Sequence, residues 1–179
     1  MKLTYALFAL VILTSIQLVS AKDRNLVVNG SFEEPVVADN GVASYKEIPG
    51  WTTTLGDGIE VQHNCCGEAY ERSQLVELDG QANSAMRQAI STMPGLRYRL
   101  SFWYSPRPSE PLESNGIEVL FEGKSLGTIQ QDGIGLSETK YTKFTYEVIA
   151  SSTPSFIEFR AVGASNGRGG YLDNVRFEK

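Results

Sequence analysis

The sequence of 179 residues contains little of several residue types on which common functional sites depend. One histidine and two cysteines are too few for a zinc site. The 16 basic residues are outnumbered by 21 acidic ones and form no run, so the charge pattern excludes nucleic acid as a partner. Beyond the amino-terminal segment no apolar stretch is long enough to span a bilayer. We therefore expect a globular protein without a membrane span.

The amino-terminal segment has the features of a secretory signal peptide. Lys2 precedes an unbroken apolar stretch at residues 7–13, and Val19-Ser20-Ala21 offers the small side chains that signal peptidase needs. A membrane anchor is the alternative, but polar residues interrupt the stretch before the ~20 apolar residues of a stable span are reached. We expect residues 1–21 to be removed and residues 22–179 to form one secreted, extracellular domain.

Signals for tight turns are frequent along the chain. Seven Asn-Gly or Asp-Gly pairs favour the positive φ angles of hairpin turns. Between them lie short segments in which apolar and polar residues alternate, namely 59–63, 97–104, 117–121, 144–148 and 157–161. No segment of comparable length has the 3.6-residue period of a helix. The pattern predicts an all-β protein.

Many short strands in one domain bury their apolar faces best against one another. We therefore predict a two-sheet antiparallel β-sandwich of the jelly-roll type. The stretch 105–114 contains Pro106, Pro108 and Pro111, which cannot donate hydrogen bonds to a neighbouring strand. This stretch is expected to be a long surface loop.

Both ends of the expected domain carry motifs of a known group. Residues 25–33 and 169–175 resemble the ends of galactose-binding-like jelly-roll domains, especially the plant cell-wall domain of unknown function 642 and the bacterial choice-of-anchor C proteins. Interior motifs agree in order, namely residues 50–51, 58–61, 74–79, 98–102, 116–119 and 159–161. The chain differs from the plant members in having one domain instead of a tandem, from the bacterial ones in lacking an anchor, and from both in its adjacent cysteines.

This resemblance implies an extracellular module that binds carbohydrate or cell wall, with pectic polysaccharide and pectin methylesterase as the partners suggested for plant members. Similar modules often hold a structural Ca²⁺ ion where the first and last strands meet, on the Phe-Glu of the first motif and the Asp of the last. Here these are Glu33 and Asp173, with Glu34 as a possible substitute. Two close carboxylates would repel each other without a cation between them. The alternative is a solvated Glu33 and an Asp173 that caps a turn.

A sugar site needs an aromatic face for C–H groups and polar side chains for hydroxyls. The alternation in 97–104 places Trp103 with Arg97, Arg99 and Ser101 on the face opposite the core. The same count turns charged residues of other strands outward. The predicted carbohydrate-binding set, on one sheet face, is Trp103, Arg99, Glu118, Arg160 and Glu60. An ordinary solvated face is the alternative.

Loops offer a second candidate for the sugar site. Tyr45, Trp51, Tyr70 and Arg107 lie near turns, although Trp51 after Pro49-Gly50 fits the core at least as well. The sequence does not choose between a sheet face and a loop rim.

Catalysis is weakly indicated. Acids such as Glu60, Glu77 and Asp79 could be imagined as a glycosidase pair, yet acids on alternating strands are equally expected for solubility. His63 has no serine or cysteine arrangement of a nucleophile motif beside it. We predict a secreted, non-catalytic carbohydrate-binding module. The alternative is a structural or protein-interaction module of an extracellular matrix or wall, with cell-wall proteins as partners.

Cys65 and Cys66 are adjacent and are the only cysteines in the chain. In an oxidising compartment they can bond to each other, cross-link two molecules or stay reduced. A disulfide between neighbours closes a tight ring, because adjacent Cα atoms are only ~3.8 Å apart, and it adds little global stability. We favour this vicinal disulfide, which would rigidify the loop between His63 and Tyr70.

One N-glycosylation acceptor pattern is noted at Asn29-Gly30-Ser31. It falls inside the expected first strand, where it would be poorly accessible.

Overall fold

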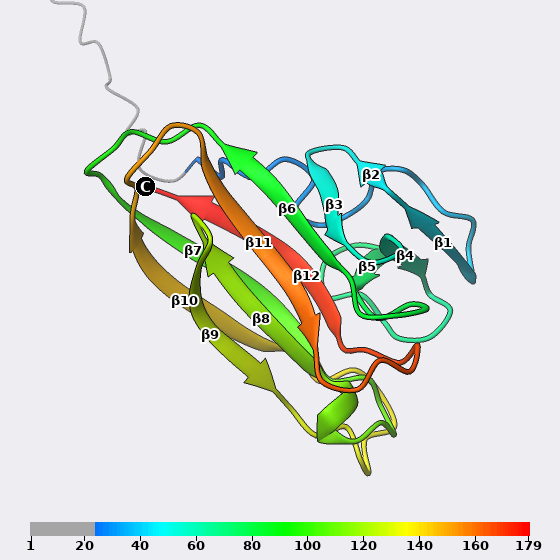
Figure 1. The fold of residues 1–179 in the computed structure, drawn as a ribbon. Helices are drawn as coiled ribbons and strands as arrows, with labels where there is room; N and C mark the ends of the chain where they lie inside the picture. Colours follow the sequence, from blue (N-terminus) through cyan, green and yellow to red (C-terminus); the bar gives the residue numbers. More distant parts are fainter. Residues whose placement is uncertain (1–23) are drawn as a thin grey trace, which may run out of the picture.

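The computed structural model describes residues 24–179 and consists of two antiparallel sheets of six strands each. In Figure 1, β8 and β11 of one sheet pass in front of β7 and β12 of the other, so that the sheets pack face to face. The predicted all-β sandwich is confirmed. The predicted signal peptide at residues 1–21 lies outside the described residues.

The first sheet has the strand order β1-β4-β5-β12-β7-β10. Its strands are β1 (Gly41–Tyr45), β4 (Ile59–His63), β5 (Gln74–Glu77), β12 (Tyr171–Glu178), β7 (Arg97–Ser105) and β10 (Thr142–Ile149). The second sheet has the order β2-β3-β6-β11-β8-β9. It consists of β2 (Glu47–Ile48), β3 (Trp51–Leu55), β6 (Ala85–Ile90), β11 (Ser155–Val162), β8 (Gly116–Phe121) and β9 (Lys124–Gln130).

Each segment with a period of two forms a strand, and the period sets which side chains are buried. In β7, Tyr98, Leu100, Phe102 and Tyr104 are at most 3% exposed, because they point between the sheets. Arg97, Arg99 and Trp103 point to the outer face and are more exposed. The prediction that Trp103 lies opposite the core side chains is confirmed.

The core is rich in aromatic rings that bridge the two sheets. Trp51 is 1% exposed, and its ring centroid lies 5.7 Å from that of Phe32 and 6.0 Å from that of Phe159. Phe159 in turn meets Phe102 of the opposite sheet edge-on at 5.0 Å. Trp51 therefore belongs to the core and is not available as a loop-rim contact for sugar.

The prediction that Asn29-Gly30-Ser31 lies inside a first strand is wrong. This segment runs beside β12, where the Leu26 N–H donates to the Phe177 carbonyl and the Val175 N–H to the Gly30 carbonyl. Asn29 has a φ of 52°, however, which a strand does not allow. Its side chain bonds both the N–H and the carbonyl of Glu34 and thereby closes a turn. The acceptor pattern at Asn29 therefore lies in a turn and not in a strand.

The proline-rich stretch after β7 is a surface loop, as predicted, and contains one short 3₁₀ turn, η2 (Leu112–Ser114). Its Asn115 side chain accepts from the Arg107 N–H and donates to the Glu110 and Pro111 carbonyls, which holds the loop in shape. Among residues 24–179 no helix is long and apolar enough to cross a membrane.

One carboxylate ties two turns together at the end of the sandwich where β8 meets β9. Glu122 accepts hydrogen bonds from the side chains of Ser151, Ser152 and Ser155 and from the Ser151 and Ser152 N–H groups. Partial desolvation raises the pKa of Glu122, but the serine donors outweigh it and lower the pKa to about 2. Hydrogen bonds to the charged form therefore favour ionised Glu122 in the folded state.

We predict that Glu122→Gln lowers the free energy of unfolding at neutral pH and has no effect at strongly acidic pH. A depressed pKa adds stability above the unfolded value of 4.5, and this stability is lost as the pH falls toward about 2. Urea unfolding of both chains across this range measures the difference. Glu147→Gln, which removes only a surface partner of Arg99, is the control and should change little. A constant gap between wild type and Glu122→Gln at all pH values would contradict the prediction.

Candidate functional site

Three aromatic rings gather on the outer face of the first sheet. Tyr70 lies 3.9 Å from Trp103, centroid to centroid, with an interplanar angle of 17°. Tyr141 meets Tyr70 edge-on at 5.6 Å. Tyr70 is the outermost ring and is 42% exposed, whereas the other two are half-buried. These three residues are called the aromatic cluster below.

The aromatic cluster combines a sheet residue with two loop residues. Trp103 lies on β7, directly opposite Asp173 of β12 and Lys143 of β10. Tyr70 comes from the β4–β5 loop (residues 64–73), and Tyr141 directly precedes β10. The two alternatives from the sequence, a sheet face and a loop rim, therefore meet at one place. Tyr141 was missed, since no periodic pattern distinguishes it from other loop residues.

Two carboxylates accept hydrogen bonds from backbone N–H groups in the carboxyl-terminal half of the β4–β5 loop and at the start of β5. Asp173 Oδ2 accepts the N–H groups of Tyr70 and Glu71, both at 2.8 Å. Glu33 Oε1 accepts the N–H groups of Ser73 and Gln74 at 3.1 and 3.0 Å. The carboxylates predicted to hold calcium are thus bound to the same loop.

This arrangement does not fit a calcium ion shared by Glu33 and Asp173. The N–H groups direct positively polarised hydrogens at the oxygens that a cation would need. Asp173 Oδ1 also accepts the Asn174 N–H, so neither of its oxygens is without a donor. Within residues 24–179 no group of three or more His, Cys, Asp or Glu side chains is placed to hold a metal.

Asp173 is fully buried although it is a carboxylate. Burial raises its pKa to about 7, against the lowering effect of the backbone N–H groups of Glu71, Asn174 and Tyr70. Burial and the nearby Asp173 also raise the pKa of Tyr141, whose hydroxyl stays protonated and donates to the Glu68 carbonyl at 3.0 Å. The Thr139 hydroxyl donates to the same carbonyl.

A hollow of about 350 Å³ lies beside the aromatic cluster. Its lining consists of Asn64, Cys66, Gly67, Glu68, Pro108, Ser137, Glu138 and Thr139. Glu68 and Thr139 are each two residues from a ring of the cluster, which places the hollow at its flank. The lining includes amide, hydroxyl and carboxylate groups that can bond sugar hydroxyls.

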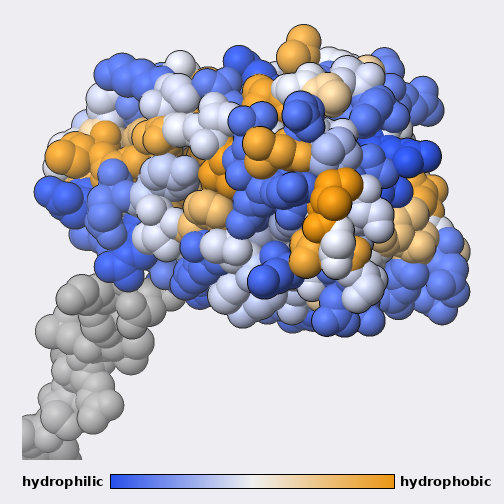
Figure 2. All heavy atoms as spheres, turned by 90° about the horizontal axis from the view of Figure 1, so that it is seen from below, coloured by the Kyte–Doolittle hydropathy of each residue, from blue (hydrophilic) through white to orange (hydrophobic). Residues whose placement is uncertain are grey.

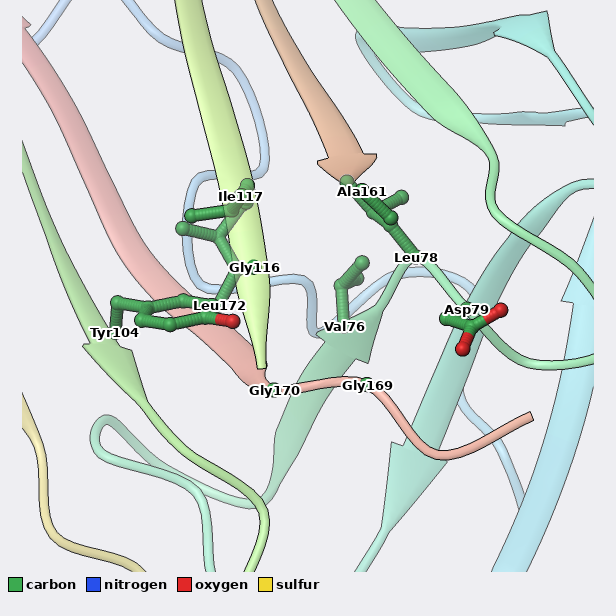
Figure 3. Close-up of a pocket in the computed structure, with 10 residues that line it drawn as sticks. All are labelled: Val76, Leu78, Asp79, Tyr104, Gly116, Ile117, Ala161, Gly169, Gly170 and Leu172. Carbon is green, nitrogen blue, oxygen red and sulfur yellow. The ribbon is translucent and has the colours of Figure 1, made fainter. Parts of the chain in front are cut away.

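A much smaller void lies between the sheets of the described residues. The void drawn in Figure 3 lies between the ends of the sheets and is lined mainly by apolar residues such as Val76, Leu78 and Leu172. Its volume of about 10 Å³ has room for about one water molecule. This void is too small for a sugar ring.

A buried ion pair lies beneath the Cys65-Cys66 segment. The fully buried Glu77 accepts from Arg107 Nη1 at 2.8 Å and from the Gln62 amide at 2.6 Å. Burial raises the pKa of Glu77 to about 8, and Arg107 opposes this rise. The Arg107 guanidinium also lies over the Tyr171 ring, 5.8 Å from its centroid. Arg107 is thus engaged in anchoring its loop to the sheet.

The prediction that five residues share one sheet face is wrong. Glu118 and Arg160 lie on β8 and β11 of the second sheet, where Arg160 pairs with Glu118 at 3.5 Å and with Glu158 at 2.9 Å. Outward-facing residues of the two sheets point away from each other. Alternation predicts which side chains point outward but not to which sheet a strand belongs.

The other two predicted residues share the face of Trp103 but lie away from it. Arg99 is four residues along β7, about 13 Å at the usual rise, and pairs with Glu147. Glu60 is on β4, three strands away, or roughly 14 Å. Glu60 accepts from the Gln62 amide and lines a separate hollow of about 300 Å³.

Of the adjacent cysteines, Cys66 lines the hollow beside the aromatic cluster. Their sulfur atoms are 2.6 Å apart and are not joined by a bond in this structure. Two effects raise the pKa of the Cys65 thiol to about 12. Burial is the larger one, and the neighbouring Cys66 side chain is the next. The Cys66 carbonyl accepts from the Tyr171 hydroxyl at 2.8 Å, so this part of the β4–β5 loop also rests on the sheet.

Figure 2 views the molecule from below the orientation of Figure 1, at the end where the loops after β7, β9 and β11 lie. Hydrophobic residues on this face form several separate patches among hydrophilic ones. Scattered patches of this kind are ordinary for a protein surface.

Comparisons with known proteins begin with sequence. No family model matches the chain, so the resemblance to the domain of unknown function 642 and to choice-of-anchor C proteins is not confirmed. Halomucin of Haloquadratum walsbyi is 29% identical over 171 residues, which cover 88% of this chain and 2% of halomucin. A multifunctional-autoprocessing repeats-in-toxin of Vibrio vulnificus is 29% identical over 155 residues, which cover 84% of this chain and 3% of the toxin. The chain thus spans a very small part of these curated relatives.

Solved structures with similar folds include modules that bind carbohydrate. Family 16 Carbohydrate Binding Module-2 matches with a TM-score of 0.57 and 17% identity, over 87% of this chain and all of the module. The K1 cleaved adhesin domain of Lys-gingipain from Porphyromonas gingivalis W83 matches with a TM-score of 0.56 and 14% identity, over 77% of this chain and 96% of that domain. A family 35 carbohydrate binding module from an environmental isolate matches with a TM-score of 0.55 and 9% identity, over 78% of this chain and 93% of that module. The chain therefore has the β-sandwich fold that is found in these carbohydrate-binding modules.

Proposed function

We propose that this protein is a secreted, non-catalytic carbohydrate-binding module that contacts its glycan through Tyr70. The observation that carries the proposal is the exposed Tyr70 ring, which stacks on Trp103 beside a hollow lined by amide, hydroxyl and carboxylate groups. The fold shared with carbohydrate-binding modules supports it.

The geometry suits a sugar ring for a physical reason. Trp103 backs one face of the Tyr70 ring, and the 42% of Tyr70 that is exposed can meet the C–H groups of a sugar. The hydroxyls of the same sugar would reach Asn64, Ser137 and Thr139 in the hollow. A backed ring loses little rotamer freedom on binding, which favours affinity.

Secretion, cell-wall association and membership in the domain-of-unknown-function 642 group belong to this proposal. Secretion is supported by the signal-like segment at residues 1–21. Extracellular polysaccharide is the expected ligand, and cell-wall proteins are the expected neighbours.

We predict that Tyr70→Ala weakens glycan binding at least about tenfold, because it removes the exposed stacking surface. A glycan array of the secreted protein, followed by titration of the best ligand, measures the loss. Phe156→Ala is the matched control, since Phe156 is a similarly exposed ring on β11 of the second sheet, stacked under Arg87. Binding that survives Tyr70→Ala would contradict the assigned site. A blank array together with protein partners recovered by pull-down would favour the interaction module instead.

Calcium at Glu33 and Asp173 stays a prediction from the sequence, and thermal unfolding tests it. An ion bound only to the folded state would raise the melting temperature by several degrees at millimolar calcium. The N–H donors at both carboxylates lead us to expect no calcium response in the wild type. A rise that chelation reverses and that Asp173→Ala abolishes would restore the calcium assignment.

The vicinal disulfide also has a direct test. We expect the non-reduced secreted protein to be a monomer lighter by the mass of two hydrogens than the reduced chain, without thiol labelling of Cys65 or Cys66. Intact-mass spectrometry with and without reduction measures this. A disulfide-linked dimer, or two alkylatable thiols on the folded protein, would contradict it.

A further inference from the structure

The position of the Tyr70 ring is set by the backbone N–H groups of Tyr70 and Glu71. No residue of the β4–β5 loop is fully buried, so burial of apolar side chains does not by itself explain why the loop lies on the sheet. The N–H groups of Tyr70 and Glu71 instead converge on a single carboxylate oxygen of Asp173. Asp173 in turn lies directly across from Trp103, the ring on which Tyr70 stacks.

We propose that Asp173 is the positioning residue of the glycan site, and that its buried carboxylate fixes the Tyr70 ring over Trp103 by accepting the Tyr70 and Glu71 N–H groups. This inference rests on the proposed function only for its consequence on glycan affinity. The positioning itself can be measured without any ligand.

The chemistry of the position calls for a carboxylate. Both Asp173 oxygens act as acceptors, Oδ2 from the loop and Oδ1 from the Asn174 N–H at 2.6 Å. An asparagine has the same shape, but its NH₂ group would face either the Tyr70 and Glu71 N–H groups or the Asn174 N–H group, and an NH₂ group cannot accept a hydrogen bond from them. Charge-assisted hydrogen bonds are also the stronger kind. Glu33 holds the far end of the loop in the same way but does not touch the residue that carries the ring.

Tryptophan fluorescence gives a readout that is specific for this contact. The chain has two tryptophans, of which Trp51 is 1% exposed in the core. Quenching by acrylamide therefore reports mainly on Trp103, and a Trp103→Phe chain shows how much Trp51 contributes. Loss of the Tyr70 cover should expose Trp103 to the quencher.

The test compares Asp173→Asn with Asp79→Asn. Asp79 is a matched control because it is also buried, at 1% exposure, and accepts a loop N–H, that of Asn166, but is not bonded to the β4–β5 loop. We expect Asp173→Asn to raise the quenching constant of Trp103 about twofold and to weaken the best glycan about tenfold. Asp79→Asn should leave both at the wild-type value. Unchanged quenching in Asp173→Asn, or an equal change in both variants, would overturn the proposal.

Amide hydrogen exchange in the wild type tests the same hydrogen bonds without a variant, and it applies even if Asp173→Asn does not fold. The Tyr70 and Glu71 amides should exchange at least about a hundredfold more slowly than unprotected amides. Exchange at the unprotected rate would overturn the proposal. A blank glycan array with the expected quenching and exchange would sink the carbohydrate function while supporting Asp173 as the anchor of Tyr70.

Discussion

The outer face of the first sheet depends on one buried carboxyl group, that of Asp173, whose oxygens accept backbone N–H groups. Asp173 lies under the β4–β5 loop with no exposed surface, and the N–H groups of Tyr70, Glu71 and Asn174 surround its oxygens. A buried carboxylate without such donors would be costly, and a loop with unpaired N–H groups would be costly as well. Each therefore requires the other, and the aromatic cluster forms where they meet.

A second buried carboxylate, Glu77, acts in a similar way on the neighbouring strand, where it lies opposite Tyr171. Glu77 is surrounded by Arg107, Gln62 and the Gly169 N–H, and it ties the proline-rich loop to the sheet. The two carboxylates lie on the neighbouring strands β5 and β12 and hold the loops that border the hollow. The surface proposed to bind sugar is thus built by polar anchoring, whereas the sandwich itself is built by apolar packing.

The two tryptophans illustrate this division. Trp51 bridges Phe32 and Phe159 inside the sandwich and donates its indole N–H to the Asn29 carbonyl. Trp103 points outward and serves as the support for Tyr70. Similar ring chemistry stabilises the fold in one case and presents an exposed ring in the other.

Much of the fold could be predicted from the sequence alone. A period of two over 97–104 determines that Phe102 is buried and Trp103 is not, because successive side chains of a strand point to opposite faces. The period does not determine which strands are neighbours, so Glu118 and Arg160 were wrongly placed with Trp103. Strand pairing is decided by contacts between residues far apart in the chain, and only the tertiary structure brings Tyr70 within 3.9 Å of Trp103 and Asp173 beneath both.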